Sequence, residues 1–303
     1  MGWNEVVYTT NEEVYSSLSD LVTLAYRNRT GSVSIVGTAF PVFASKNNIL
    51  MLTATHVIEE AYDNSYCNNH KTANRFNYLP GPDNKPYELM AEWVETTEDL
   101  WCLVDDDGKL VQCHVTGVCL RPPLDMALLV LDTSHLESVT KVFAINSNVL
   151  NKGDEIVITS LITEGNTREL IARHGYITDV KSRGNLVDAP VYQTNIPIEA
   201  GASGGPVFRY TGNFNSTKEV IGVITSDFSE QQAFTEPSID GYSYVSIICS
   251  ATPLNIKSTD GLVMTFQDMC LSGYIRDVGG YINDVILTNY EDGNWSQSFP
   301  KTK

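Results

Sequence analysis

Short runs of β-branched, aromatic and other apolar residues, bounded by Gly, Pro, Asn and Asp, fill most of the chain. Runs of this length between turn-forming residues are typical of β-strands, and their regular spacing is typical of an all-β sandwich or barrel. The pattern predicts strands at Val33 to Phe43, Ile49 to Thr53, Ala127 to Leu131, Glu155 to Thr159, Glu169 to Arg173, Gly175 to Val180, Val191 to Asn195, Pro206 to Arg209, Val220 to Thr225 and Tyr242 to Cys249. The predicted fold class is therefore all-β.

Helical periodicity is scarce along the same chain. Helices are predicted at Glu12 to Leu24, directly after Thr55, and around Leu254. At the last of these, the pair Thr252-Pro253 provides a start signal, with proline at the first helical position. Helices are thus expected to be minor elements of the fold.

Three stretches differ from the strand pattern and resemble additions to a β-core. From about Ala61 to Leu110 the strand pattern is missing until Trp93, so this stretch is predicted to be a long insertion. Residues 226–241, rich in Ser, Gln, Glu and Pro, are predicted to form a long loop, and loops of this length are often functional. The tail after about Thr259 carries one moderately apolar patch and ends polar.

The composition and net charge of the chain limit the kinds of molecule that it is expected to bind. The chain has 303 residues, 42% of them hydrophobic, enough to bury one large core or two modest ones. It carries 37 Asp and Glu against 20 Lys and Arg, a formal net charge of -17. A protein that binds a phosphate backbone needs the opposite sign, so we expect no nucleic-acid partner. No apolar run approaches the roughly 18 residues of a membrane-spanning helix, and we expect no membrane partner.

The N-terminus and the cysteines bear on compartment and metal binding. Residues Met1 to Val6 lack the basic and apolar regions of a secretory signal, so we expect a cytoplasmic protein unless a leader has been removed. The six cysteines are then expected to be mostly reduced thiols. Cys67 and His70 form half of a metal-binding pattern, but no C-x-x-C pair completes it. Structural zinc is the weaker alternative, and we expect no metal and no cofactor.

A glycine-rich bend, Gly201-Ala202-Ser203-Gly204-Gly205-Pro206, lies between two strand-like runs. Such a bend exposes the Ser203 hydroxyl. Its small residues also let the backbone N–H groups of Gly201 and Ser203 converge on one point, as an oxyanion hole requires. For this block alone, an ordinary glycine-rich turn is an equally good interpretation.

A serine hydroxyl becomes nucleophilic when a neighbouring base takes its proton. Of the five histidines, His56 directly follows an apolar strand and is the candidate base. His70, His114, His135 and His174 lack this context and are expected to be structural.

A buried carboxylate must then orient the imidazole of the base. Asp125 opens a strand-like apolar run and is the candidate for this role. Asp132, at the other end of the same run, is interpreted as a solvated strand end.

Three blocks, Thr53-Ala54-Thr55-His56, Asp125-Met126-Ala127-Leu128-Leu129 and the bend around Ser203, resemble the signature blocks of the chymotrypsin-like serine proteases, in that family's order. The resemblance covers roughly residues 30–255. It implies two antiparallel six-stranded β-barrels, with His56 and Asp125 from the first barrel and Ser203 from the second. The active site is then expected in the cleft between them.

The same resemblance implies domain boundaries. It predicts an N-terminal extension over residues 1–30 and a first barrel over residues 31–140, interrupted by the insertion at about 61–110. A second barrel is predicted over residues 141–258, followed by a C-terminal extension over residues 259–303.

Within the family the chain is most similar to the Deg/HtrA-type bacterial peptidases, through the run Gln193 to Gly205. Val57 also replaces the disulfide cysteine that follows the histidine in secreted digestive enzymes. The run Ile221 to Thr225 resembles the strand that pairs with substrate, and this likeness places the Thr225 hydroxyl near Asp125 as a supporting partner. The chain after the barrels is too short for the PDZ domain of Deg proteases.

The activity implied is that of a serine endopeptidase, which hydrolyses a polypeptide substrate through a His-Asp-Ser triad and an acyl-enzyme. Two alternatives stay open: a catalytically silent pseudoprotease or peptide-binding double barrel, and an esterase that uses the same triad. Pro197 stands where trypsin-like enzymes keep the aspartate that binds basic side chains, so trypsin-type selectivity is not implied. The sequence does not identify a regulatory partner.

The sequence also predicts whether the chain needs N-terminal cleavage to become active. In secreted digestive relatives, a freed N-terminal amine pairs with an aspartate immediately before the nucleophile and orders the oxyanion hole. Ala202 occupies that position here and offers the amine no partner, and an unpaired buried amine is costly. We therefore expect activity without N-terminal cleavage. The oxyanion loop is then held by its own geometry and neighbouring loops, or by a regulatory contact with another molecule.

Overall fold

The computed structural model describes most of two β-barrels and short strands beyond them. Described are residues 20–44, 48–66, 92–94, 96–106, 109–121, 125–136, 142–145, 149–164, 167–182, 190–212, 219–227 and 243–248, and six short strands after residue 254.

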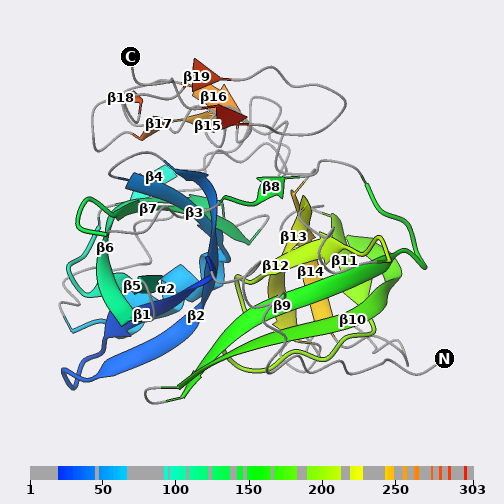
Figure 1. The fold of residues 1–303 in the computed structure, drawn as a ribbon, viewed down its shortest axis with the longest axis horizontal. Coiled ribbons are helices and arrows are strands. Elements are labelled where there is room, and N and C mark those ends of the chain that lie inside the picture. The colour runs from blue at the N-terminus through cyan, green and yellow to red at the C-terminus, as the bar shows by residue number, and fades with distance from the viewer. Residues whose placement is uncertain are drawn as a thin grey trace.

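The first barrel is a closed sheet of six antiparallel strands (Figure 1). Its hydrogen-bonded order is β6-β5-β1-β2-β3-β7, and a pairing between β6 and β7 closes the ring. A short strand, β4 (Glu92–Val94), pairs with β6 at residues that do not face β5. The barrel strands are β1 Val22–Arg27, β2 Val33–Ala44, β3 Asn48–Thr53, β5 Leu100–Asp106, β6 Lys109–Arg121 and β7 Met126–Asp132.

The second barrel repeats this architecture (Figure 1). Its order is β12-β9-β10-β11-β14-β13, and a pairing between β12 and β13 closes it. β8 (Ala144–Ile145) joins β13 in parallel. The barrel strands are β9 Glu155–Glu164, β10 Thr167–Ser182, β11 Pro190–Thr194, β12 Pro206–Arg209, β13 Glu219–Asp227 and β14 Ser243–Ile247. The predicted pair of closed six-stranded antiparallel barrels is confirmed.

Most strands lie within a few residues of the predicted ranges, because each apolar run fills a barrel interior. The corrections concern three segments. No strand is predicted over Lys109–Arg121, which forms β6 of the first barrel. Val22 to Leu24, predicted as the end of a helix, belong to β1, which pairs with both β2 and β5. Residues 100–106, predicted as part of the insertion, form β5 of the same barrel. The first barrel therefore begins before residue 31, and its sequence resumes before residue 110.

Two further predicted elements have a clear outcome. The helix expected after Thr55 is confirmed as α2 (Thr55–Asn64), which buries Val57, Ile58, Ala61 and Tyr62. The separate strands predicted before and after His174 form one continuous strand, β10, because ten consecutive residues of it pair with β9. Of the loop predicted over residues 226–241, Ser226 and Asp227 belong to β13, and residues 228–241 lie outside the described residues, as does the helix start at Leu254.

One apolar cluster spans both barrels, and a separate cluster fills part of the second barrel. The spanning cluster joins residues of the first barrel, such as Phe40 and Leu50, to Val157 and Phe208 of the second. Phe143, in the connection between the barrels, packs edge-on against Phe40 and at 5.6 Å between ring centroids against Phe208. Its backbone N–H donates to the carbonyl of Pro41 at 2.9 Å. The barrels are therefore fixed against one another by side-chain packing.

Short hairpins follow the second barrel. They pair β15 (Asn255–Lys257) with β16 (Val263–Thr265), β17 (Tyr274–Ile275) with β18 (Gly280–Tyr281), and β19 (Ile286–Leu287) with β20 (Gln297–Ser298). Across the described part of the chain, no helix has the length and apolar character needed to cross a membrane.

Candidate active site

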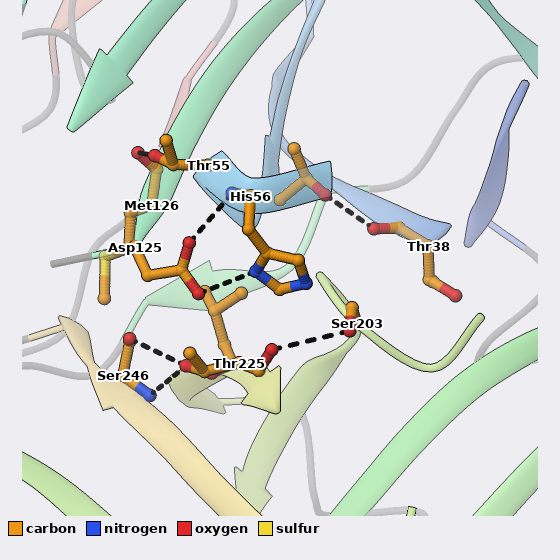
Figure 2. Close-up of polar contacts among 10 residues, drawn as sticks. Thr38, Thr55, His56, Asp125, Met126, Ser203, Thr225 and Ser246 are labelled. Atoms are coloured by element: carbon orange, nitrogen blue, oxygen red, sulfur yellow. Dashed lines mark hydrogen bonds and ion pairs between the residues drawn. The ribbon is translucent and has the colours of Figure 1, made fainter. Parts of the chain in front are cut away.

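His56 and Asp125 meet at the edge of the first barrel. His56 stands in the first turn of α2, immediately after β3, and Asp125 immediately precedes β7, the strand that pairs with β3. One carboxylate oxygen of Asp125 lies 2.8 Å from Nδ1 of His56, and the other accepts the backbone N–H of His56 at 2.9 Å. The same carboxylate thus fixes both the ring and the backbone of the histidine (Figure 2).

The two side chains of this pair differ in their exposure to solvent. The side chain of Asp125 is 4% exposed and that of His56 is 35% exposed. Near a buried anion a protonated imidazole is stabilised, and a hydrogen bond at Nδ1 places the remaining lone pair of a neutral ring on Nε2. The half-exposed ring can therefore exchange a proton at Nε2 while the buried carboxylate holds its other nitrogen.

The backbone at Asp125 has a positive φ of 50°, the single non-glycine residue of this kind in the described chain. Aspartate tolerates this left-handed region better than most residues, yet such conformations are uncommon and often occur at functional sites. Here the conformation turns the chain into β7 while aiming the carboxylate at α2. The hydroxyl of Thr55 donates to the Met126 carbonyl at 2.5 Å and ties the two segments together next to the pair.

Ser203 directly follows a tight turn, Glu199 to Ala202, and precedes β12 of the second barrel. The carbonyl of Glu199 accepts the N–H of Ala202 at 3.0 Å, and Gly201, the third residue of this turn, has a φ of 90°. A type II turn requires positive φ at that position, which favours glycine. The central peptide of this turn, between Ala200 and Gly201, carries the Gly201 N–H.

From Gly201 to Gly205, three backbone N–H groups donate hydrogen bonds to described residues, and two do not. Ala202 donates to Glu199, Gly204 donates to Ile224 and Gly205 donates to Ala202, each through backbone carbonyls at 2.9 to 3.0 Å. Among the described residues, none accepts a hydrogen bond from the N–H of Gly201 or of Ser203. These are the two donors that the sequence predicts for an oxyanion hole, and they are available for a ligand.

Thr38 of β2 binds the segment around Ser203 to the first barrel. Its backbone N–H donates to the carbonyl of Ser203 at 2.9 Å, and its hydroxyl donates to the carbonyl of Gly201 at 3.1 Å. The same hydroxyl accepts the N–H of Leu161 at 3.2 Å. Thr38 is fully buried, so these bonds are shielded from water. The two residues that carry the available N–H groups are thereby held at a fixed distance from His56.

Glycine makes this close approach of the barrels possible. A Cβ on Gly204 would lie 2.2 Å from the Thr38 carbonyl oxygen and 2.1 Å from Oγ1 of Thr53, atoms that hydrogen-bond to each other at 2.8 Å. A Cβ on Gly37 would lie 2.8 Å from the carbonyl oxygen of Ser203. Real Cβ atoms do not come so close, so the site depends on the missing side chains.

The hydroxyl of Thr225 does not take the position predicted for it. A bulge between Ile224 and Ser226 shifts the register of β13 against β14, and there the Thr225 hydroxyl accepts the N–H of Ser246 at 3.2 Å. Thr225 Oγ1 also lies 2.8 Å from the Ser246 hydroxyl, so Ser246, rather than Asp125, is its partner. The Thr225 carbonyl faces the site instead and accepts the Ser203 hydroxyl at 3.4 Å (Figure 2).

The other candidate side chains are placed away from this site. Asp132, at the far end of β7, accepts the N–H of Ser134 at 3.0 Å, and this bond lowers the pKa of its carboxyl. Cys102 and Cys113 face each other across β5 and β6 as buried thiols, and burial raises the pKa of Cys102 well above its ordinary value. In the part of the chain that the structure describes, no cluster of three or more His, Cys, Asp or Glu is suited to a metal ion. Cys67 and His70 lie outside it.

Comparison with protein families decides the family. Residues 37–223, well over half of the chain, match the trypsin-like peptidase domain family. The chain belongs to this family. The matched range includes His56, Asp125 and Ser203, and the family predicted from the sequence is confirmed.

Solved structures similar to this trypsin-like peptidase domain include "HtrA-type protease AlgW with tripeptide", at 16% identity and a TM-score of 0.46, covering 78% of this chain and 58% of that one. The AlgW structure with a decapeptide has the same identity and score and is covered over 63% of its length. The chain thus spans about three fifths of these AlgW chains. "Crystal structure of Deg5" has 17% identity and a TM-score of 0.46, with 79% of this chain and 91% of that chain covered. A search of curated proteins finds no significant match.

Proposed function

We propose that the chain is a serine endopeptidase in which Ser203 is the nucleophile, His56 its base and Asp125 the group that orients the base. The observation that carries this proposal is the buried Asp125 carboxylate at 2.8 Å from His56 Nδ1, since it leaves Nε2 as the basic atom on the Ser203 side of the ring. Family membership supports the same reaction class.

The proposed reaction proceeds in two steps. His56 Nε2 takes the proton of the Ser203 hydroxyl while Oγ bonds to the carbonyl carbon of a peptide, and the resulting oxyanion accepts the N–H groups of Gly201 and Ser203. The protonated His56 then gives its proton to the leaving amine as the C–N bond breaks. Water, deprotonated by His56, attacks the acyl-enzyme in the same way and releases the second product and Ser203.

One observation favours the alternative of a catalytically silent, peptide-binding double barrel. In this structure the Ser203 hydroxyl donates to the Thr225 carbonyl. At 3.4 Å this bond is longer than the range of about 2.5–3.0 Å usual for hydroxyl donors, so it restrains Ser203 weakly. Rotation about the Cα–Cβ bond of Ser203 releases it, and catalytic hydrogen bonds in ligand-free enzymes are often long or misaligned. The geometry therefore supports the peptidase over the silent domain.

The test compares Ser203→Ala with Ser134→Ala, a serine of an exposed turn. Hydrolysis of an unstructured protein should fall by on the order of a millionfold in Ser203→Ala if the triad acts as a unit, and should be unchanged in Ser134→Ala. A fluorophosphonate probe should label wild type and Ser134→Ala on Ser203, as mapped by mass spectrometry. Equal turnover in Ser203→Ala and wild type would reject the assignment.

The same experiment separates the remaining alternatives. An esterase would hydrolyse an activated ester but leave the unstructured protein intact. A silent domain would bind a peptide, as measured by fluorescence anisotropy, without cleaving it and without reacting with the probe.

A further inference from the structure

The turn that presents the Gly201 N–H has no ionic anchor at its C-terminal end. Ala202, the residue before the nucleophile, is 2% exposed and packs in the apolar cluster of the second barrel with Ile196 and Ile158. A charged group buried there would find an apolar environment, at a high cost. Whatever orders this turn must therefore act elsewhere.

At the N-terminal end of the same turn lies a buried arginine. Arg173 of β10 is 8% exposed. Its Nη1 donates to the carbonyl of Pro197 at 2.8 Å, and its Nη2 forms an ion pair with the Glu199 carboxylate. The planar guanidinium thus spans two residues of the segment that leads into the turn, in the fork geometry that makes arginine pairs specific in direction.

Burying an arginine side chain in this way costs free energy. A buried guanidinium loses hydration, and Arg173 Nε has no acceptor among the described residues. Its partner Glu199 is half-exposed, with a side chain that is 48% accessible, so the pair gains only part of the strength of a buried one. Stability alone therefore explains this arrangement poorly, and its position beside the turn suggests a local role.

We propose that Arg173 and Glu199 form an internal latch that holds the oxyanion turn. The proposal rests on the function proposed above. Glu199 is the first residue of the turn: Arg173 binds its carboxylate, and its carbonyl accepts the Ala202 N–H. With Glu199 and Pro197 fixed, the peptide between Ala200 and Gly201 keeps the orientation in which the Gly201 N–H is available.

Without the ion pair between Arg173 and Glu199, the turn can adopt a second backbone conformation. Type I and type II turns differ mainly by a rotation of the central peptide through roughly half a turn, as their dihedral angles show. In the type I form the Gly201 N–H would point away and a carbonyl would take its place. Arg173 is then a positioning residue that acts through Glu199, in the role that an N-terminal amine plays when an aspartate precedes the nucleophile.

The kinetic test uses Arg173→Gln and Glu199→Gln, with Arg209→Gln and Glu169→Gln as matched controls. Both control residues are exposed on strands of the same barrel, and Glu169 shares β10 with Arg173. Removing one oxyanion donor outright costs about 10²–10³ in kcat. Loosening the turn should cost less, so we expect kcat to fall by about tenfold to a hundredfold in both latch variants and KM to stay within about twofold.

Three further readouts separate positioning from a general structural role. Arg173→Lys, which restores the charge but not the fork, should recover part of kcat. The double variant Arg173→Gln/Glu199→Gln should be no slower than the slower single variant, because both remove one interaction. Affinity for a peptide boronate, which mimics the tetrahedral intermediate, should fall in proportion to kcat, while binding of a product peptide stays unchanged.

A measurement that needs no activity tests the latch directly. Amide hydrogen exchange of Ala202, followed by NMR, reports the turn hydrogen bond to Glu199. It should accelerate at least tenfold in both latch variants and stay at the wild-type rate in both controls. Exchange rates and kcat values that change as little in the latch variants as in Arg209→Gln would overturn the proposal.

The two proposals can fail separately. If Ala202 exchange accelerates in the latch variants but wild type cleaves neither peptide nor ester, the latch stands and the peptidase function is wrong. If wild type is active and Ala202 exchange is unaffected by the variants, the function stands and the latch is wrong. Should Arg173→Gln fail to fold, the half-exposed Glu199→Gln decides both readouts.

Discussion

Replacing Gly204 by alanine tests how closely the two barrels must approach beside the nucleophile. Gly204 has a φ of 85°, and an added Cβ would lie between the Thr53 hydroxyl and the Thr38 carbonyl, at 2.1 and 2.2 Å from them. Gly212 has nearly the same φ, 89°, with no atom within 4 Å of an added Cβ. The pair Gly204→Ala and Gly212→Ala therefore separates the cost of the backbone conformation from that of the contact.

The expected magnitudes follow from these two terms. Placing an L-residue in the left-handed region costs about 1–2 kcal/mol, and Gly212→Ala should lose only this amount. In Gly204→Ala the Cβ must move more than about 1 Å to reach ordinary carbon contact distances of about 3.5 Å, and overpacking a rigid site adds about 1–3 kcal/mol or more. Gly204→Ala should therefore be destabilised by about 2–5 kcal/mol.

The assay is urea unfolding of both variants and wild type, with the midpoint and the slope measured together. Turnover of a peptide substrate gives a second reading. A displacement of Ser203 on the order of 1 Å costs about 10²-fold in rate, so Gly204→Ala should lose about that much kcat and Gly212→Ala almost none. Unfolding free energies within about 0.5 kcal/mol of each other, together with equal kcat, would refute the close approach as a requirement of the site.

Two of the remaining predictions concern Asp125 and His56 of the site, a third concerns Asp132 at the far end of β7, and a fourth concerns the N-terminus. Asp125→Asn should lower kcat by around four orders of magnitude, the scale of loss when a serine protease loses its orienting carboxylate, while Asp132→Asn leaves kcat unchanged; the reverse result would make Asp132 the orienting carboxylate. The Ser134 N–H lowers the pKa of Asp132 below its ordinary 3.8, so wild type should be more stable than Asp132→Asn above that pH. This difference should vanish as the pH falls through the lowered pKa, as thermal unfolding at several pH values would show. Activity should fall in acid as His56 becomes protonated, since only the neutral ring accepts the serine proton; a pH profile of kcat that is flat down to about pH 4 would exclude it as the base. Because Ala202 is buried among apolar side chains, protein with an intact N-terminus should react with a fluorophosphonate, and labelling seen only after cleavage near residues 25–35 would contradict this.

The family and the two-barrel fold could be predicted because their signals are local. Most barrel strands are apolar runs between turn residues, and the blocks around His56, Asp125 and Ser203 are each a few residues long. The glycines of the third block owe their identity to positive φ and to close contacts, which a sequence motif reflects directly. β1, β5 and β6 were not predicted as strands: β1 overlaps the predicted helix, β5 follows a long polar stretch, and polar residues interrupt the apolar run of β6.

The remaining features depend on contacts between distant positions. Thr38 reaches a carbonyl 163 residues along the chain, and Arg173 reaches a carboxylate 26 residues away, so no local pattern marks either residue. The direction of the Thr225 hydroxyl depends on a bulge in the pairing of β13 with β14, and a register shift of this kind has no signature in one strand alone. Sequence reasoning therefore identified the candidate reacting groups but not the residues that hold them in place.

The packing of Phe143 limits the motion of one barrel relative to the other. At Phe143 the connection is packed between Phe40 and Phe208 and hydrogen-bonded to Pro41, so this described part of it is fixed to both barrels. Opening the barrels would split the apolar cluster that spans both of them, so separation of His56 from Ser203 belongs to global unfolding rather than to a low-energy local motion. Heat or denaturant should then abolish the site and the fold in one transition. Changes in activity short of that transition are left to the loops and turns, which can shift while the barrels stay joined.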